Sequence, residues 1–249
     1  MSGHSKWANI KHRKGRQDAK RGKLFGKLGK AIEVAARNGG GNIEFNPTLG
    51  TAVEKAKAAS MPNDNIERAI KRGTGEVEGA IYEESFYEGY GPGGVALYVQ
   101  VLTDNRNRAA SDVRSAFTRH NGNLGEPGSV GYLFTQRGLI LASGSEDDVM
   151  LAAIDAGADD IRDAGDGLYE VVTEPTDLRD VRDALGKGGV EIESADVTQL
   201  PSNTVHVEED EAKKLLRLID ALEDLDDVQA VFSNYDIDDE VMEKVLAEA

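Results

Sequence analysis

The 249-residue chain contains no cysteine, so disulfides, thiolate zinc sites and cysteine nucleophiles are excluded. Proline (6) and tryptophan (1) are also scarce, and no apolar run approaches the roughly twenty residues that a membrane-spanning helix needs. The apolar core of a signal peptide is missing too. Because a chain without thiols suits a reducing compartment, we expect a cytoplasmic protein with no membrane partner.

Patterns that would indicate catalysis or metal binding are missing as well. The four histidines, at positions 4, 12, 120 and 206, have no metal-ligand spacing and no obvious carboxylate or serine partner. Acidic residues at 236 and 238–240 resemble the start of a calcium loop, but the glycine and closing glutamate of such a loop are absent. We therefore expect no catalytic residue, metal, cofactor or small-molecule substrate, and a protein that is not an enzyme.

Charge is abundant and unevenly distributed. The chain has 45 acidic and 29 basic residues, a net charge of −16. Residues 1–80 nevertheless carry 16 basic and 8 acidic side chains, and the first thirty alone hold ten basic residues against Asp18. Residues 81–249 carry 13 basic and 37 acidic side chains. Since an acidic body repels phosphates, contact with a polyanion is expected at the basic N-terminal region.

Six of the basic residues follow one another at spacings of three and four, which places them in one stripe on a helix: Arg13, Arg16, Lys20, Lys23, Lys27 and Lys30. A second, apolar stripe lies about 100° around the same helix: Leu24, Leu28, Ala31 and Ala35. The pattern predicts a helix from about residue 17 to 37 that packs on a core and holds its cations toward solvent. A solvated charged face and a transit peptide are the alternative interpretations.

The predicted nucleic-acid-binding residues extend from this stripe into the preceding arm. They are Lys6, Trp7, Lys11, His12, Arg13, Lys14, Arg16, Lys20, Lys23, Lys27 and Lys30. Trp7 either stacks on a base or plugs a local core. Base-edge contacts from Asn9, His12 or Gln17 would supply any preference for a DNA sequence.

The remaining N-terminal elements have clear boundaries. Asn38-Gly39-Gly40-Gly41 ends the first helix, Asn46-Pro47 starts a second, and a third follows Pro62 and ends at Gly73. Three glycines at 22, 26 and 29 weaken the first helix. Residues 1–80 are thus predicted to form a basic helical domain, and the segment 73–94, rich in glycine, acid and aromatics, to be the domain boundary.

Two sets of strands and helices follow, and each has the order β-α-β-β-α-β of a ferredoxin-like fold. One set comprises strands at 95–103 and 130–134, strands at 204–207 and 228–235, and helices near 105–117 and 209–222. The other lies between them, with strands at 139–142, 161, 168–173 and 190–197 and helices at 146–156 and 177–185. The predicted fold class is α+β: an N-terminal three-helix domain and two ferredoxin-like domains, residues 81–135 plus 202–249 and, inserted, the acidic 136–201. The absence of an RNP-type motif argues against either sheet being an aromatic RNA platform.

Three stretches carry a resemblance to a known family. They are GHSKWANIKHRKGRQDAKRGKLF near the N-terminus, KAKAASMPNDNIERAIKRGTG at 55–75, and YEGYGPGGVALYVQVLTDNRNRAASDVRSAF at 87–117, followed by GSVGYLF at 128–134. This chain resembles the YebC family, whose members are described as probable transcriptional regulators in bacteria and as a translational activator in mitochondria. The resemblance implies a three-domain, non-enzymatic, cytoplasmic protein of gene expression. The three glycines of the first helix depart from it, because bulkier residues are expected there.

Two functions fit these features. A DNA-binding transcriptional regulator would set the basic stripe against the phosphates of a duplex. A translation factor would use the same residues on messenger RNA or on the RNA of the ribosome, where stacking on single strands gives Trp7 a role. Charge alone does not separate DNA from RNA, and the oligomeric state is left open.

Overall fold

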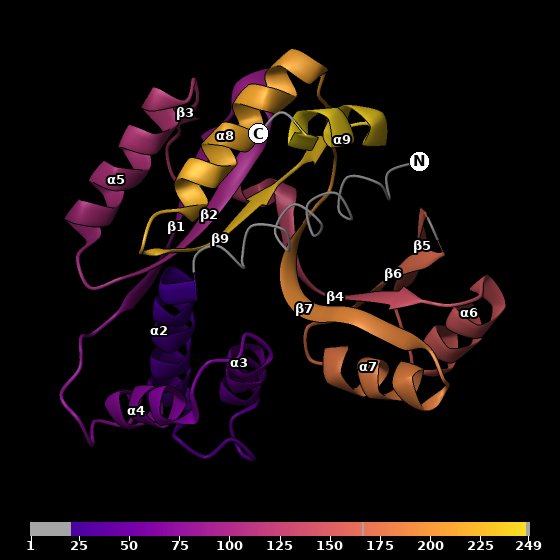
Figure 1. Ribbon diagram of the computed structural model, residues 1–249, viewed down its shortest axis with the longest axis horizontal. Coiled ribbons are helices and arrows are strands. Elements are labelled where there is room, and N and C mark those ends of the chain that lie inside the picture. The colour runs from indigo at the N-terminus through magenta and orange to yellow at the C-terminus, as the bar shows by residue number, and fades with distance from the viewer. Residues whose placement is uncertain (1–20, 166, 248–249) are drawn as a thin grey trace.

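The computed structural model describes residues 21–165 and 167–247. Its ribbon shows a helical unit and two sheets, each with helices packed on it (Figure 1). The order of the elements and the antiparallel pairing of both larger sheets confirm the predicted α+β class. The predicted helix start near Gln17 lies outside the described residues.

The helical unit consists of α2 (Arg21–Gly39), α3 (Pro47–Ala58) and α4 (Asn63–Gly73). Asn46 caps α3 as predicted, since its side chain accepts a hydrogen bond from the Leu49 amide and Pro47 occupies the first turn. Pro62 precedes α4, also as predicted. The unit buries its own apolar cluster: Ile32, Ala35, Ala36, Leu49, Val53, Ala56, Met61, Ile66 and Ala69.

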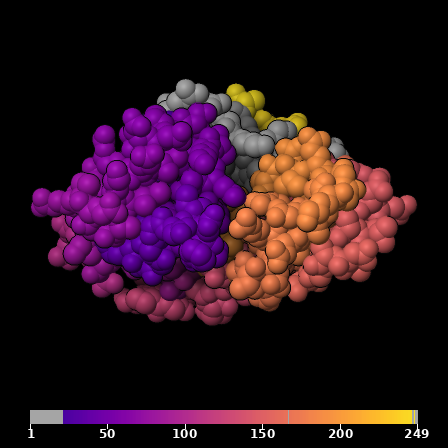
Figure 2. Space-filling view, turned by 90° about the horizontal axis from the view of Figure 1, so that it is seen from below, coloured from indigo at the N-terminus to yellow at the C-terminus, as the bar shows by residue number. Residues whose placement is uncertain are grey.

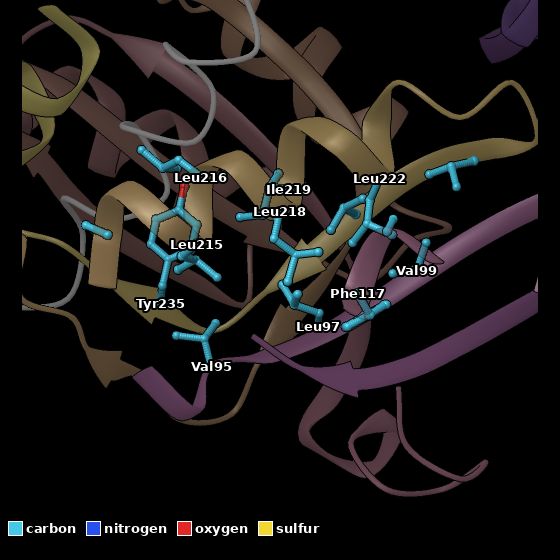
Figure 3. Close-up of a cluster of buried hydrophobic side chains, with 14 of the residues drawn as sticks. Val95, Leu97, Val99, Phe117, Leu215, Leu216, Leu218, Ile219, Leu222 and Tyr235 are labelled. Atoms are coloured by element: carbon cyan, nitrogen blue, oxygen red, sulfur yellow. The ribbon is translucent and has the colours of Figure 1, made fainter. Parts of the chain in front are cut away.

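The outer sheet has the order β3-β1-β2-β9, and its neighbours run antiparallel. Its strands are β1 (Glu83–Tyr90), β2 (Ala96–Thr103), β3 (Asn123–Leu124) and β9 (Val228–Ser233). Two helices, α5 (Arg106–Arg119) and α8 (Glu209–Glu223), cover one face of it. Figure 3 shows Leu215, Leu218 and Leu222 of α8 reaching toward Leu97 and Val99 of β2 and toward Phe117.

Strand β1 was not predicted, because it lies inside the segment interpreted as a domain boundary. Its sequence EESFYEGY does not alternate between apolar and polar residues as a typical strand does, because it begins with exposed acids and buries a glycine. Gly89 is needed there because a Cβ would lie 2.7 Å from the Phe117 ring and 2.6 Å from the Asn123 carbonyl oxygen.

Of the strands predicted at 95–103, 130–134, 204–207 and 228–235, the second is wrong and the third is shorter than predicted. Residues 130–134 form the short helix η2 (Gly131–Leu133), and only Phe134 begins a strand. The Glu88 carboxylate accepts hydrogen bonds from the amides of Gly128, Val130 and Gly131, which withdraws them from any sheet. At 204–207 only β8 (Val205–His206) forms, and it pairs with β10 (Tyr235–Asp236) in a separate small sheet. In the outer sheet, strand β1 pairs with β2 instead of a strand from either of these two segments.

The inserted unit has the predicted order of elements. Its strands β4 (Phe134–Ser143), β5 (Asp160–Gly165), β6 (Leu168–Thr173) and β7 (Glu191–Pro201) lie in the order β5-β6-β4-β7, which is the ferredoxin-like arrangement. Helices α6 (Glu146–Asp155) and α7 (Leu178–Lys187) enclose its core. The chain returns through α8 and β9 to a last helix, α9 (Asp239–Ala247).

The inserted unit is attached through two paired strands. Phe134 of β4 lies opposite Pro201 of β7, and the Ser202 amide donates to the Leu133 carbonyl. The helical unit lies beside β7 and α7 (Figure 2), where Lys55 is paired with Asp196 at 2.7 Å and Glu54 with Arg182 at 3.3 Å. The three predicted domain boundaries stay a prediction.

Close contact of α2 with α4 generates a stability prediction. A Cβ on Gly73 would lie 2.7 Å from the Ala36 Cβ and would also meet the Glu33 carbonyl oxygen. We expect Gly73→Ala to lower the free energy of unfolding by about 1–3 kcal/mol, as overpacking does. Gly26→Ala is the control, because a Cβ there meets nothing within 4 Å, and it should stabilise by up to about 1 kcal/mol. Urea unfolding measures both, and equal effects would contradict this packing.

The paired strands predict that the insertion is dispensable for folding. Thr135 lies opposite Leu200, so an Asn-Gly turn in place of residues 136–199 closes a hairpin without moving either strand. We expect the shortened protein to unfold cooperatively on heating, with near-ultraviolet circular dichroism of a packed core. A broad, non-cooperative transition would show that the outer sheet depends on the insertion.

Candidate nucleic-acid interface

Three lysines of the predicted stripe contact one acidic segment of the chain. This segment, the acidic corner, comprises residues 223–227 and joins α8 to β9. The amines donate to its backbone: Lys23 Nζ to the Asp224 oxygen at 2.9 Å, Lys27 Nζ to the Glu223 oxygen at 2.5 Å and Lys30 Nζ to the Asp226 oxygen at 3.0 Å. Figure 1 shows one end of α2 meeting the loop between α8 and β9.

The end of α8 is a natural site for these cations. The last carbonyl groups of a helix have no donor within the helix, and they form the negative end of its dipole. Helix α8 has no basic residue in its own last turn. Lys23 and Lys27 of α2 therefore supply, from another unit of the fold, the positive charge that usually comes from the helix itself.

Lys30 makes a second contact with the Asp227 carboxylate, at 2.6 Å. That carboxylate also accepts hydrogen bonds from Arg108 Nη2 at 2.8 Å and from Thr103 Oγ1 at 2.9 Å. Only 7% of Asp227 is exposed. Burial by itself would raise the pKa of Asp227, but the three donors outweigh it and hold the pKa below its usual value.

The pKa of Lys27 is strongly shifted. Burial lowers its pKa from 10.5 to about 8, although Glu223, Asp224 and Asp226 act in the opposite direction. Its amine is therefore close to its titration point in mildly alkaline solution. An isolated ammonium group in water would stay charged there.

A cleft of about 780 Å³ opens between α2 and the outer unit. Gly22 and Gly26 form one wall, and a Cβ on either would meet nothing within 4 Å. Arg108 and Asp112 of α5 and the acidic corner form the other walls. These are two of the glycines at which the family resemblance predicts bulkier residues, so their effect here is to leave a face of α2 bare.

The predicted site residues fall into two groups. Lys23, Lys27 and Lys30 are brought together on one face of α2, but Lys27 and Lys30 are half-buried against the acidic corner. The expectation that this row faces solvent is therefore wrong for these two. The other predicted residues lie outside the described part of the chain: Lys6, Trp7, Lys11, His12, Arg13, Lys14, Arg16 and Lys20.

The sequence prediction also missed part of the interface. Arg108, Thr103 and Asp227 were not singled out, although the acid-rich stretch EDLDD at 223–227 complements the basic N-terminal region. The apolar stripe predicted for α2 is confirmed in part, since Ala35 is buried and Leu28 packs against the same cluster. Ile32 and Ala36 lie at the centre of the core, and Leu24 is only half-buried.

The described residues contain no group of three or more histidines or acids arranged to hold a metal ion. Over the same residues, no helix is both long enough and apolar enough to cross a membrane.

The pKa of Lys27 predicts a pH dependence of stability. Between about pH 8 and 10.5 the unfolded chain holds more protons on this amine than the folded one, so stability rises with pH in this window. We expect the wild type to gain about 2 kcal/mol relative to Lys27→Met between pH 7 and about pH 9.5. Urea unfolding at constant ionic strength gives this difference. Parallel pH curves for the two proteins would contradict the lowered pKa.

Comparison with known proteins shows similarity over the whole chain. Residues 5–76 match the family "TACO1/YebC protein N-terminal domain", and residues 82–235 match "TACO1/YebC second and third domain". A probable transcriptional regulatory protein of Halothermothrix orenii is 54% identical, with 100% of each chain covered. Another from Streptomyces coelicolor is 57% identical over 99% of this chain and 100% of the other.

A solved structure agrees with the fold. The crystal structure of a conserved hypothetical protein from Aquifex aeolicus matches with a TM-score of 0.80 and 50% identity, covering 90% of this chain and 94% of that one. Together with the matches of both family descriptions, these similarities show that the chain belongs to the TACO1/YebC family.

Proposed function

We propose that this protein is a non-enzymatic, nucleic-acid-binding regulator of gene expression, and specifically a DNA-binding transcriptional regulator of the cytoplasm. The observation that carries the proposal is the separation of charge, with ten basic residues among the first thirty and a strongly acidic body. The names of the relatives as probable transcriptional regulatory proteins support it.

Electrostatics restricts binding to the N-terminal region. Each phosphate neutralised by a basic side chain releases condensed counterions, which favours binding at low salt. Lys23, Lys27 and Lys30 span about 10 Å along the axis of α2, which is comparable to a few successive phosphates of one strand. The acidic remainder of the chain repels the same phosphates, so it orients the nucleic acid toward the arm and α2.

One observation favours RNA as the alternative ligand and a translation factor as the alternative function. On β1 and β2, the rings of Phe86 and Tyr98 stack with centroids 4.5 Å apart, and Tyr98 stacks on Phe134 at 5.6 Å. Leu97 and Val99 pack under α8, so Tyr98, between them, points to the opposite face.

Phe86 and Tyr98 are half-buried and Phe134 is buried, and the outer sheet has no RNP-type motif in its sequence. Unpaired bases of RNA stack on the aromatic side chains of a sheet in other proteins. Glu84 and Glu88 lie close enough to raise the pKa of Tyr98 together with burial, the larger cause. Their charge disfavours phosphates at this face, which keeps RNA second to DNA.

Two full-length variants of equal net charge test the proposal. In the first, Lys11, Arg13, Lys14 and Arg16 are replaced by alanine. In the second, four exposed cations from other parts of the fold are replaced: Lys57, Arg114, Arg179 and Lys187. Affinity is measured over a salt series for duplex DNA and for single-stranded RNA.

We expect the first variant to flatten the slope of log affinity against log salt by up to about 3.5 on DNA and about 3 on RNA. The second should leave the slope nearly unchanged. Tighter binding of DNA favours the transcriptional function, and tighter binding of RNA favours the alternative. Equal losses of affinity in both variants would show that only net charge matters and that the arm is not the binding site. Absence of binding by the wild type would overturn the proposal.

A further inference from the structure

We propose that the acidic corner is an internal competitor for nucleic acid: it holds Lys27 and Lys30 in a closed form, and phosphates reach these two half-buried lysines only when α2 separates from it. This proposal rests on the proposed function, because it concerns the regulation of the same basic surface.

The corner offers these lysines the chemistry that a phosphate backbone would offer. Three carbonyl oxygens and one carboxylate accept hydrogen bonds from the amines of Lys23, Lys27 and Lys30 at 2.5–3.0 Å. Oxygen acceptors with negative charge at this distance are also what a phosphate provides. Each ammonium group has three N–H donors, so a hydrogen bond to the corner does not by itself exclude a phosphate. Lys27 and Lys30 are half-buried against the corner, however, so a phosphate gains full access to them only when α2 moves away, whereas Lys23 is exposed in both forms.

Charge strengthens this competition. Glu223, Asp224, Asp226 and Asp227 stand within one short segment, and three of them act on the Lys27 amine. A phosphate approaching the lysine row would meet these four acids within a Debye length of about 10 Å. Opening therefore removes a repulsive group and exposes an attractive one in a single movement.

The closed form is held by contacts that can break without unfolding either unit. Among the described residues, the buried cluster of the helical unit and that of the outer sheet share no member. Residues 74–82, which connect the two units, lie between α4 and β1 and contain no helix or strand. The contacts across the cleft described above are hydrogen bonds and ion pairs, which salt weakens.

Contacts of the helical unit with the inserted unit are also weak. The pairs Lys55 with Asp196 and Glu54 with Arg182 join partly exposed side chains. Surface pairs of this kind contribute up to about 1 kcal/mol each. A ligand that binds only the open form shifts the population toward it, and its apparent affinity falls by the fraction of protein that is open.

A crosslink across the cleft tests the competition. Because the chain has no cysteine, two introduced thiols are the only ones that the crosslinker can join. Gly26 of α2 and Asp112 of α5 line the same cleft, are both exposed, and leave all three lysines intact. The double variant Gly26→Cys, Asp112→Cys is either joined by a short bismaleimide or capped on both thiols with N-ethylmaleimide. Binding of a short duplex DNA and of a single-stranded RNA is then measured over a salt series.

We expect the joined protein to bind at least about tenfold more weakly than the capped one and to lose up to about 1.8 from its salt slope on DNA, the share of the two contacts of Lys27 and Lys30. Equal affinity and slope in the two forms would overturn the competition while leaving the proposed function in place. If the capped form and the wild type bind neither nucleic acid, the proposed function fails and the competition fails with it.

A second pair of variants gives the same answer without a crosslink. Asp224→Asn with Asp226→Asn removes charge from the acidic corner, whereas Asp238→Asn with Glu240→Gln removes the same charge from an exposed site before and at the start of α9. We expect the corner variant to gain about three- to tenfold in affinity over the control, because it also weakens the closed form. Equal gains would show only long-range repulsion and would overturn the proposal.

Discussion

The arrangement of the helical unit on the outer sheet depends on one buried carboxylate. Asp227 receives donors from α2, β2 and α5, through Lys30, Thr103 and Arg108. A buried charge with three donors is compensated, but the same charge with a donor removed is costly, since its desolvation is no longer offset. The carboxylate therefore ties the position of α2 to that of the outer sheet, although the two units bury separate apolar clusters.

The sequence predicted those elements whose boundaries are set by local chemistry. Asn46, Pro47 and Pro62 place the starts of α3 and α4 through capping and through the fixed backbone angle of proline, and both helices form there. The inserted unit was also predicted in its element order, because the apolar runs of β4 and β6 and the apolar stripe of α7 are visible in the sequence itself. None of these features depends on a distant part of the chain.

The sequence prediction was wrong where a residue far away in the sequence determines the local structure. Whether residues 130–134 form a strand depends on Glu88, which lies about forty residues earlier and takes up their amides. Strand β1 was missed because its buried Gly89 is required by the Phe117 ring, which belongs to a later helix. The direction of the lysine row was misjudged for the same reason. Periodicity places Lys23, Lys27 and Lys30 on one face of a helix, but only the fold shows that the end of α8 lies against that face.

The insertion has a consequence for the order in which the chain folds. Strand β2 pairs with β9, and Val99 lies opposite Val231, so the outer sheet must bring together segments that are far apart in the sequence. Such distant pairing is slow because the loop between the segments loses entropy when it closes. The inserted unit contains mainly its own contacts, and on folding it brings Phe134 next to Pro201. It thereby shortens the loop that must close when β2 pairs with β9. Early folding of the insertion therefore increases the rate at which the outer sheet forms.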